Sequence, residues 1–156
     1  MYLAFKLVHI VAVILFLGNI TTGLFWKTLA DRTRDLRIIA HTMDGIIRSD
    51  RLFTIPGVVV ILIGGLGAAI VGRLPILGTG WILWATILFT ISGLAFMVKV
   101  APLQVRLLAL ARGGNENPAF DWHRYHALSR EWEVWGLIAL LTPAAAMVLM
   151  VLKPAL

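Results

Sequence analysis

The sequence contains no cysteine, and this absence removes several kinds of site at once. Disulfides, iron–sulfur clusters, thiolate zinc sites and cysteine nucleophiles all need a thiol that this chain does not have. Charge is scarce as well, because Asp, Glu, Lys and Arg make up 14% of the 156 residues, whereas soluble chains contain about 25%. The chain also has no nucleophile motif, phosphate-binding loop or dinucleotide fingerprint, so no common enzyme chemistry can be read from a motif.

Apolar side chains are abundant instead, at 60% of the residues, and the mean hydropathy is +0.89. A soluble domain of this size has too little interior to bury so many of them. A bilayer span needs about 20 mostly apolar residues, and it must be helical because lipid offers no partners to backbone groups. The sequence therefore predicts an all-α fold, a four-transmembrane-helix bundle forming one integral membrane domain over residues 1–156. The predicted spans are residues 2–26, 52–71, 80–100 and 134–152.

Basic residues are distributed unevenly between the two sides of the predicted bundle. Eleven of the fourteen lie in the long connections 27–51 and 99–130, and all eight acidic residues lie on the same side of the bundle as these connections. The opposite side has only Lys6, Arg73 and Lys153. The positive-inside rule then places both long connections in the cytoplasm and both termini in the periplasm of a bacterial inner membrane. The net charge of +6 suggests anionic lipid headgroups and not nucleic acid, since no basic stripe alternates with exposed aromatics.

The long connections have helical patterns of their own. Apolar residues recur at helical spacing through 35–47, and Leu103–Ala111 continues the third span in the same way. Asn117-Pro118 or Asp121 is a suitable start for a helix that runs into the fourth span. We therefore expect helices that extend past the membrane on the cytoplasmic side, with their charges on a solvated face.

His9 is the most informative single residue, because an ionisable side chain inside a span is costly and marks a functional site by default. Neutral imidazole is a common axial ligand for haem iron. The alternative is a structural histidine that forms a hydrogen bond to a neighbouring helix.

Other residues fall at the same predicted depth as His9. They are Gly64 and Ala68 in the second span, Trp84 in the third and Met147 in the fourth. Small residues would let a flat macrocycle approach the backbone, and Met147 is a possible second axial ligand. The alternatives are that the small residues mediate helix packing and that the methionine fills a gap.

A second and weaker metal site can be proposed on the charged side. His123 and His126 are three residues apart and share a helical face, where Glu131 or His41 would complete a ligand set. Salt bridges between the connections are the competing interpretation.

Several stretches of the sequence resemble a bacterial family of predicted integral membrane proteins of unknown function. They are Lys6–Ile10 with Phe16–Ile20, Phe25–Asp35 and Asp50–Gly57. The match covers nearly the whole chain, and the family label implies no reaction.

A more distant resemblance is to HemJ-type protoporphyrinogen oxidases and to copper-resistance D-like membrane domains. It is carried by Lys6-x-x-His9-Ile10, Ala111-Arg112-Gly113 and Val151-Leu152-Lys153-Pro154. HemJ-type proteins bind haem b through a first-span histidine, so the resemblance implies that His9 is the ligand.

The chain also departs from the HemJ type. Trp81 and Trp84 occupy the region of a functional lysine, and only Glu131 matches the family's motif at the start of the fourth span. The resemblance therefore implies haem binding more strongly than it implies protoporphyrinogen oxidation.

Three functions remain after this comparison. The first is a haem b protein, and a HemJ-like oxidoreductase with a redox partner is one form that this function could take. The second is a transport protein for copper or a small solute, in which His9, Met147 and Met150 would supply ligands. The third is a non-catalytic scaffold or assembly subunit. A homodimer is a further expectation, because Gly-rich faces favour association in membranes.

Overall fold

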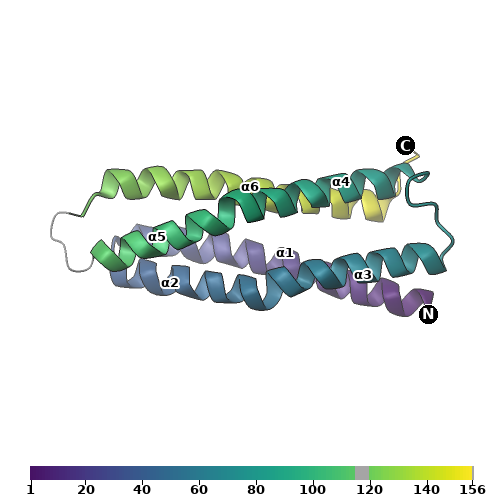
Figure 1. Ribbon diagram of the computed structural model, residues 1–156, viewed down its shortest axis with the longest axis horizontal. Helices are drawn as coiled ribbons and strands as arrows, with labels where there is room; N and C mark the ends of the chain where they lie inside the picture. The colour runs from purple at the N-terminus through teal and green to yellow at the C-terminus, as the bar shows by residue number, and fades with distance from the viewer. Residues whose placement is uncertain (115–119, 156) are drawn as a thin grey trace.

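A computed structural model describes residues 1–114 and 120–155, and over these residues the chain is helical and contains no strand (Figure 1). The first helix, α1, is Tyr2–Thr33. The others are α2 (Leu36–Ser49), α3 (Ile55–Val71), α4 (Gly80–Ala95), α5 (Ala101–Gly114) and α6 (Trp122–Leu152).

Two short π-helical segments fuse four of these helices into two. Segment η1 (Asp50–Thr54) joins α2 to α3, and segment η2 (Phe96–Val100) joins α4 to α5. The described chain thus contains four long helices, 2–33, 36–71, 80–114 and 122–152, each apolar enough over part of its length to cross a membrane. The prediction of four spanning helices is confirmed. Each long helix covers its predicted span and continues past it at the end away from the termini.

Two helices begin at aspartate side chains that cap their first backbone N–H groups. The Asp35 side chain accepts a hydrogen bond of 2.8 Å from the Arg37 backbone N–H and starts α2. The Asp121 side chain accepts one of 2.9 Å from the Arg124 N–H and starts α6. Of the two predicted starts for this helix, Asp121 is therefore used, and Asn117-Pro118 lies outside the described residues.

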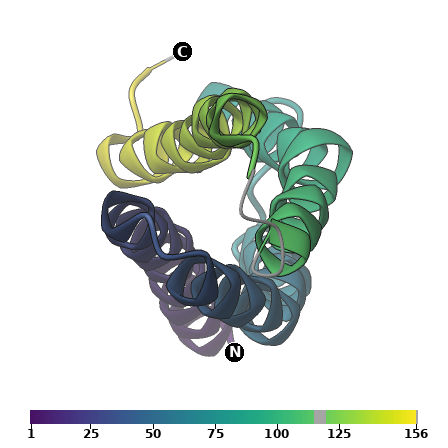
Figure 2. The same cartoon turned by 90° about the vertical axis from the view of Figure 1, so that its left-hand side faces the viewer.

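The four helices pack differently at the two ends of the bundle. At the end that holds both termini, α1 packs on α3 and α4 packs on α6 (Figure 1). At the other end α2 packs on α5, and α1 contacts both α2 and α6. Viewed along the axis, the helices surround a common centre (Figure 2). The bundle is therefore two helix pairs at one end and a continuous four-helix packing at the other.

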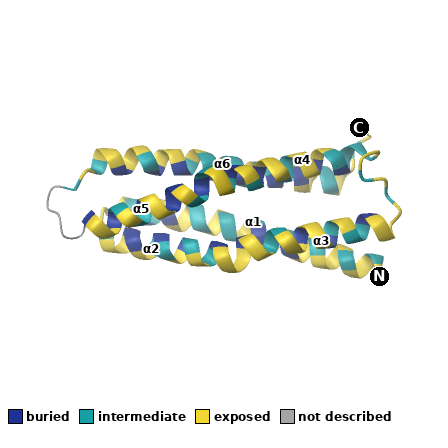
Figure 3. Cartoon of the chain, viewed as in Figure 1, coloured by how far each residue is buried: buried dark blue, intermediate teal, exposed yellow. Residues whose placement is uncertain are grey.

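Burial follows the same division (Figure 3). The larger core cluster lies among α2, α5 and α6 and includes Ile39, Met43, Leu107 and Tyr125, each 0–1% exposed. The end with the termini has a small cluster around Phe16. Its outward side chains are large and apolar, as expected where lipid takes the place of a protein neighbour.

Candidate functional site

His9 lies on α1 and is half-buried against α3. Its Nδ1 is 2.8 Å from the backbone oxygen of Ile61. A carbonyl only accepts hydrogen bonds, so Nδ1 carries a proton, and in the neutral imidazole Nε2 is then the unprotonated nitrogen. His9 therefore makes the hydrogen bond to a neighbouring helix that the structural alternative predicts. Its second ring nitrogen does not take part in that bond.

The glycines of α3 make room for α1. A Cβ at Gly64 would lie 3.0 Å from the backbone nitrogen of His9, and a Cβ at Gly65 would lie 3.0 Å from its ring carbon Cε1. At Gly67 the added atom would meet the Phe5 ring at 2.5 Å. The predicted proximity of Gly64 to His9 is thus present, but these glycines serve packing within the chain. They do not form an open face for a second copy.

The other residues predicted at this depth lie on separate elements. Ala68 is half-buried, one turn beyond Gly64 on α3. Trp84 and Met147 belong to the α4–α6 pair, where they are 52% and 41% exposed. The structure brings His9 and Gly64 into contact and leaves Trp84 and Met147 on the surface of the other helix pair.

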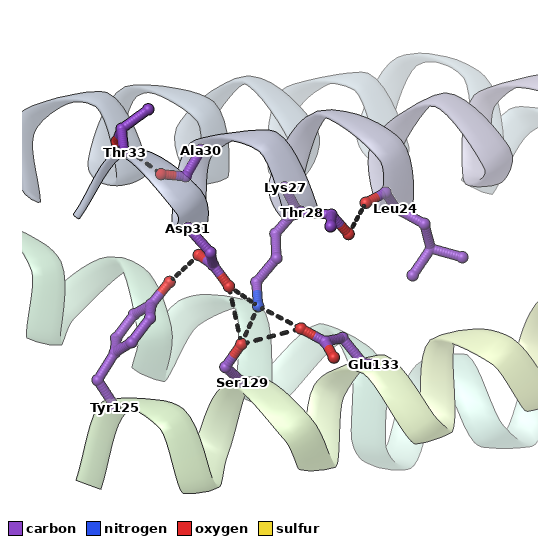
Figure 4. A network of polar contacts seen from close by, with 9 residues as sticks. All are labelled: Leu24, Lys27, Thr28, Ala30, Asp31, Thr33, Tyr125, Ser129 and Glu133. Atoms are coloured by element: carbon purple, nitrogen blue, oxygen red, sulfur yellow. Dashed lines mark hydrogen bonds and ion pairs between the residues drawn. The ribbon is translucent and has the colours of Figure 1, made fainter. Parts of the chain in front are cut away.

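At the opposite end, a buried polar network joins α1 to α6 (Figure 4). The Lys27 Nζ lies 2.6 Å from Asp31 Oδ2 and 3.1 Å from Glu133 Oε1, and it also donates to the Ser129 hydroxyl. The Tyr125 hydroxyl donates to Asp31 Oδ1 at 2.6 Å. One ammonium is therefore held by two carboxylates, which leaves the network a formal charge of −1.

The expectation of a solvated face is wrong for Lys27, which is 1% exposed. Its ammonium lies 5.3 Å from the centre of the Trp132 ring and 5.9 Å from that of Tyr125, so aromatic faces stabilise the charge as well. The sequence holds a signal for this arrangement. Tyr125, Ser129 and Glu133 recur every four residues and therefore form one polar stripe on α6.

A second buried polar cluster surrounds Asp50 in η1. Asp50 Oδ1 accepts hydrogen bonds from Asn19 Nδ2 at 3.1 Å and from the Thr54 hydroxyl at 2.7 Å, and Oδ2 accepts one from Gln104 Nε2 at 2.7 Å. Ser49 donates to the Asn19 amide oxygen. Asp50 is 6% exposed, so the expectation of a solvated side chain is wrong here too.

A cavity of about 700 Å³ adjoins the Asp50 cluster. Asn19, Asp50 and Gln104 form part of its wall, and Trp132 and Phe96 form another part. The cavity therefore lies beside both π-helical segments, a type of distortion that is frequent at functional sites.

The remaining charged pairs are exposed. Asp44 pairs with Arg48 at 2.8 Å and with Arg112 at 3.1 Å, which ties α2 to α5, and Lys99 pairs with Glu131 at 3.4 Å. Over residues 1–114 and 120–155 no group of three His, Asp or Glu side chains is arranged to hold a metal ion. The predicted ligand set around His123 and His126 is thus not assembled.

Four apolar helices with polar clusters buried at one end define an integral membrane protein of the helical-bundle class. The family described as "Predicted integral membrane protein (DUF2269)" matches residues 3–154, and the chain belongs to this family. No curated protein and no solved structure matches it significantly. The family description names no reaction, and the similarity to HemJ-type oxidases and copper-resistance D-like domains is not shown by these comparisons.

Proposed function

We propose that this membrane protein binds haem b, with His9 Nε2 as an axial ligand to the iron. The observation that supports the proposal is the 2.8 Å hydrogen bond from His9 Nδ1 to the Ile61 oxygen. Histidines that bind metals usually donate their other ring N–H to a carbonyl or carboxylate, which fixes the tautomer and the orientation of the ring. The fit of this residue to haem therefore rests on its tautomer and its position inside a span.

The surroundings of His9 support a fixed ring. Gly64 and Gly65 let α3 approach the histidine closely, so the imidazole is backed by helix backbone on that side. Ala68 continues this small-residue stripe. Met147 remains the proposed second axial ligand and Trp84 a proposed neighbour of the macrocycle, although both are largely exposed on the other helix pair. A bound haem would supply one-electron exchange, and the oxidoreductase activity and redox partner proposed from the sequence depend on it.

The proposed orientation is that of an inner-membrane protein with both termini in the periplasm. It is supported by the eleven basic residues in the connections 27–51 and 99–130. In this orientation His9 lies in the periplasmic half, and the clusters around Lys27 and Asp50 lie towards the cytoplasm.

The test is the absorption spectrum of the detergent-purified protein, before and after haem is supplied. The decisive variant is His9→Asn, because the asparagine amide nitrogen takes the place of Nδ1 and retains a donor for the Ile61 oxygen while Nε2 is lost. We expect a Soret band in the wild type and in His126→Asn, and its loss in His9→Asn. Added imidazole should restore the band in His9→Ala by replacing the missing ligand.

Two results would overturn the proposal. One is a wild-type protein that stays colourless after haem is supplied. The other is a His9→Asn variant with an unchanged spectrum, which would assign His9 to helix packing alone and favour a transport or scaffold role.

A further inference from the structure

The cavity beside the Asp50 cluster contains a single formal charge on its wall. Its lining residues include one carboxylate, that of Asp50, and no lysine or arginine. Asp50 is 6% exposed and makes no ion pair within the described residues. An unbalanced buried charge is costly, so a positive group next to it is strongly favoured.

The polar partners of Asp50 prepare it for a ligand. Asn19, Thr54 and Gln104 each donate one hydrogen bond to the carboxylate, which has about four acceptor positions. The three bonds orient the group and offset part of the cost that burial imposes on its charge, and none of them carries a compensating charge. One acceptor position and the whole negative charge are therefore left for a further partner.

The Lys27 network lies behind one wall of the cavity. Lys27 is held by both Asp31 and Glu133, so this network also carries a net negative charge. Trp132, which lies over the Lys27 ammonium, is at the same time part of the cavity wall. The Lys27 network therefore meets the cavity only through the Trp132 ring, and Asp50 is the one carboxylate among the lining residues.

The rest of the wall combines apolar and aromatic side chains with His41, Ser49 and three threonines. Its apolar and aromatic part includes Leu24, Ile46, Phe96 and Trp132. Aromatic faces attract organic cations, and they contribute more where water is excluded. A bare metal ion fits poorly, because Asn19 and Gln104 direct amide nitrogens and not oxygens at the carboxylate, and because about 700 Å³ far exceeds the size of one ion.

We propose that this cavity binds an organic cation, such as a substituted ammonium with an apolar or aromatic body. The cationic group lies at Asp50 and the apolar body lies along Phe96 and Trp132. Exposed lining residues, Trp26 on α1 and Ile38 on α2, mark the side on which the cavity opens. This site is separate from His9 and does not depend on haem.

The first test uses two probes of the same shape and different charge. Benzoylcholine carries a trimethylammonium group and an aromatic ring, and its neutral isostere has a tert-butyl group in place of the trimethylammonium. Equilibrium dialysis of the detergent-purified full chain, with protein-free micelles as the blank, measures the binding of each. We expect saturable binding of benzoylcholine at least tenfold tighter than that of the isostere. Equal binding of the two, or no binding of benzoylcholine, would overturn the proposal.

The second test uses matched variants. Asp50→Asn should abolish the preference for the cation, whereas Asp44→Asn, which changes an exposed carboxylate paired with arginines, should leave it unchanged. Gly45 lines the cavity and a Cβ there meets nothing within 4 Å, so Gly45→Phe should fold and reduce binding by obstruction. Gly18→Phe is its control, because Gly18 has equal space and does not line the cavity.

The outcomes separate the organic-cation proposal from the haem proposal. His9→Asn should bind benzoylcholine as well as the wild type does, whether or not haem is bound. If Asp50→Asn fails to fold, the comparison of the two probes and the Gly45→Phe variant still decide. An Asp50→Asn protein that folds and keeps the tenfold preference would contradict the assignment of Asp50.

Discussion

Lys27 and Glu133 are 106 residues apart in the chain and 3.1 Å apart in the structure, and this ion pair joins α1 to α6. Asp31 holds the same ammonium at 2.6 Å from within α1. The lysine is almost completely buried, and water therefore cannot solvate its ammonium. The two carboxylates and the aromatic rings beside it stabilise the charge instead.

Replacement of Lys27 by methionine should destabilise the protein strongly. Breaking a buried ion pair by removing one partner costs about 3–5 kcal/mol, because it leaves the other charge uncompensated. Lys99→Met is the control, since Lys99 pairs with Glu131 at 3.4 Å at an exposed site, where such pairs contribute about 0–1 kcal/mol. Loss of helical circular dichroism during denaturant titration in detergent measures both. Equal destabilisation by the two substitutions would contradict the structural role of the network.

Tyr125→Phe should destabilise the protein by about 1.5–3 kcal/mol, the range for a hydrogen bond to a charged group. The hydroxyl donates to Asp31 at 2.6 Å, and the phenylalanine retains the aromatic contacts of the ring. Tyr2→Phe makes the same chemical change at the first residue of α1. It serves as the matched control and should change the stability little. The same denaturant titration compares the two variants, and an unchanged Tyr125→Phe midpoint would exclude a contribution from this bond.

Gly64→Ala should destabilise the contact between α1 and α3. The new Cβ would lie 3.0 Å from the backbone nitrogen of His9, so the two helices must separate, and overpacking of this kind costs about 1–3 kcal/mol. Gly18→Ala meets no atom within 4 Å and should be neutral or stabilising, because alanine is favoured over glycine in a helix by up to about 1 kcal/mol. Thermal unfolding in detergent distinguishes them. Identical behaviour of the two variants would mean that α3 does not approach α1 so closely.

The absence of cysteine gives a direct test of the proposed orientation. Lys6→Cys and Arg37→Cys each introduce one thiol at an exposed position, at opposite ends of the bundle. A membrane-impermeant maleimide applied to cells with a permeabilised outer membrane should label the Lys6→Cys protein, and label the Arg37→Cys protein only after lysis. The reverse pattern would place the termini in the cytoplasm.

The fold was largely predictable because it depends on local quantities, the length and apolarity of each segment. The contact of His9 with Gly64 was also predictable, since both residues fall at the same depth of neighbouring spans. The burial of Lys27 and Asp50 was not. Each is surrounded by polar partners from distant segments, such as Ser129 and Gln104, and single-sequence patterns do not report such pairings. From the sequence alone, a charged residue next to a predicted span end is therefore expected to be exposed to solvent.

The two π-helical segments change how the ends of the molecule relate to each other. A π turn holds more residues than an α turn, so each segment shifts the angular position of every side chain beyond it. The face of α2 that packs on α5 and the face of α3 that packs on α1 are therefore set separately, although one continuous helix carries both. A one-residue insertion or deletion within η1 or η2 would therefore rotate one half of the helix relative to the other and misalign the two packing faces.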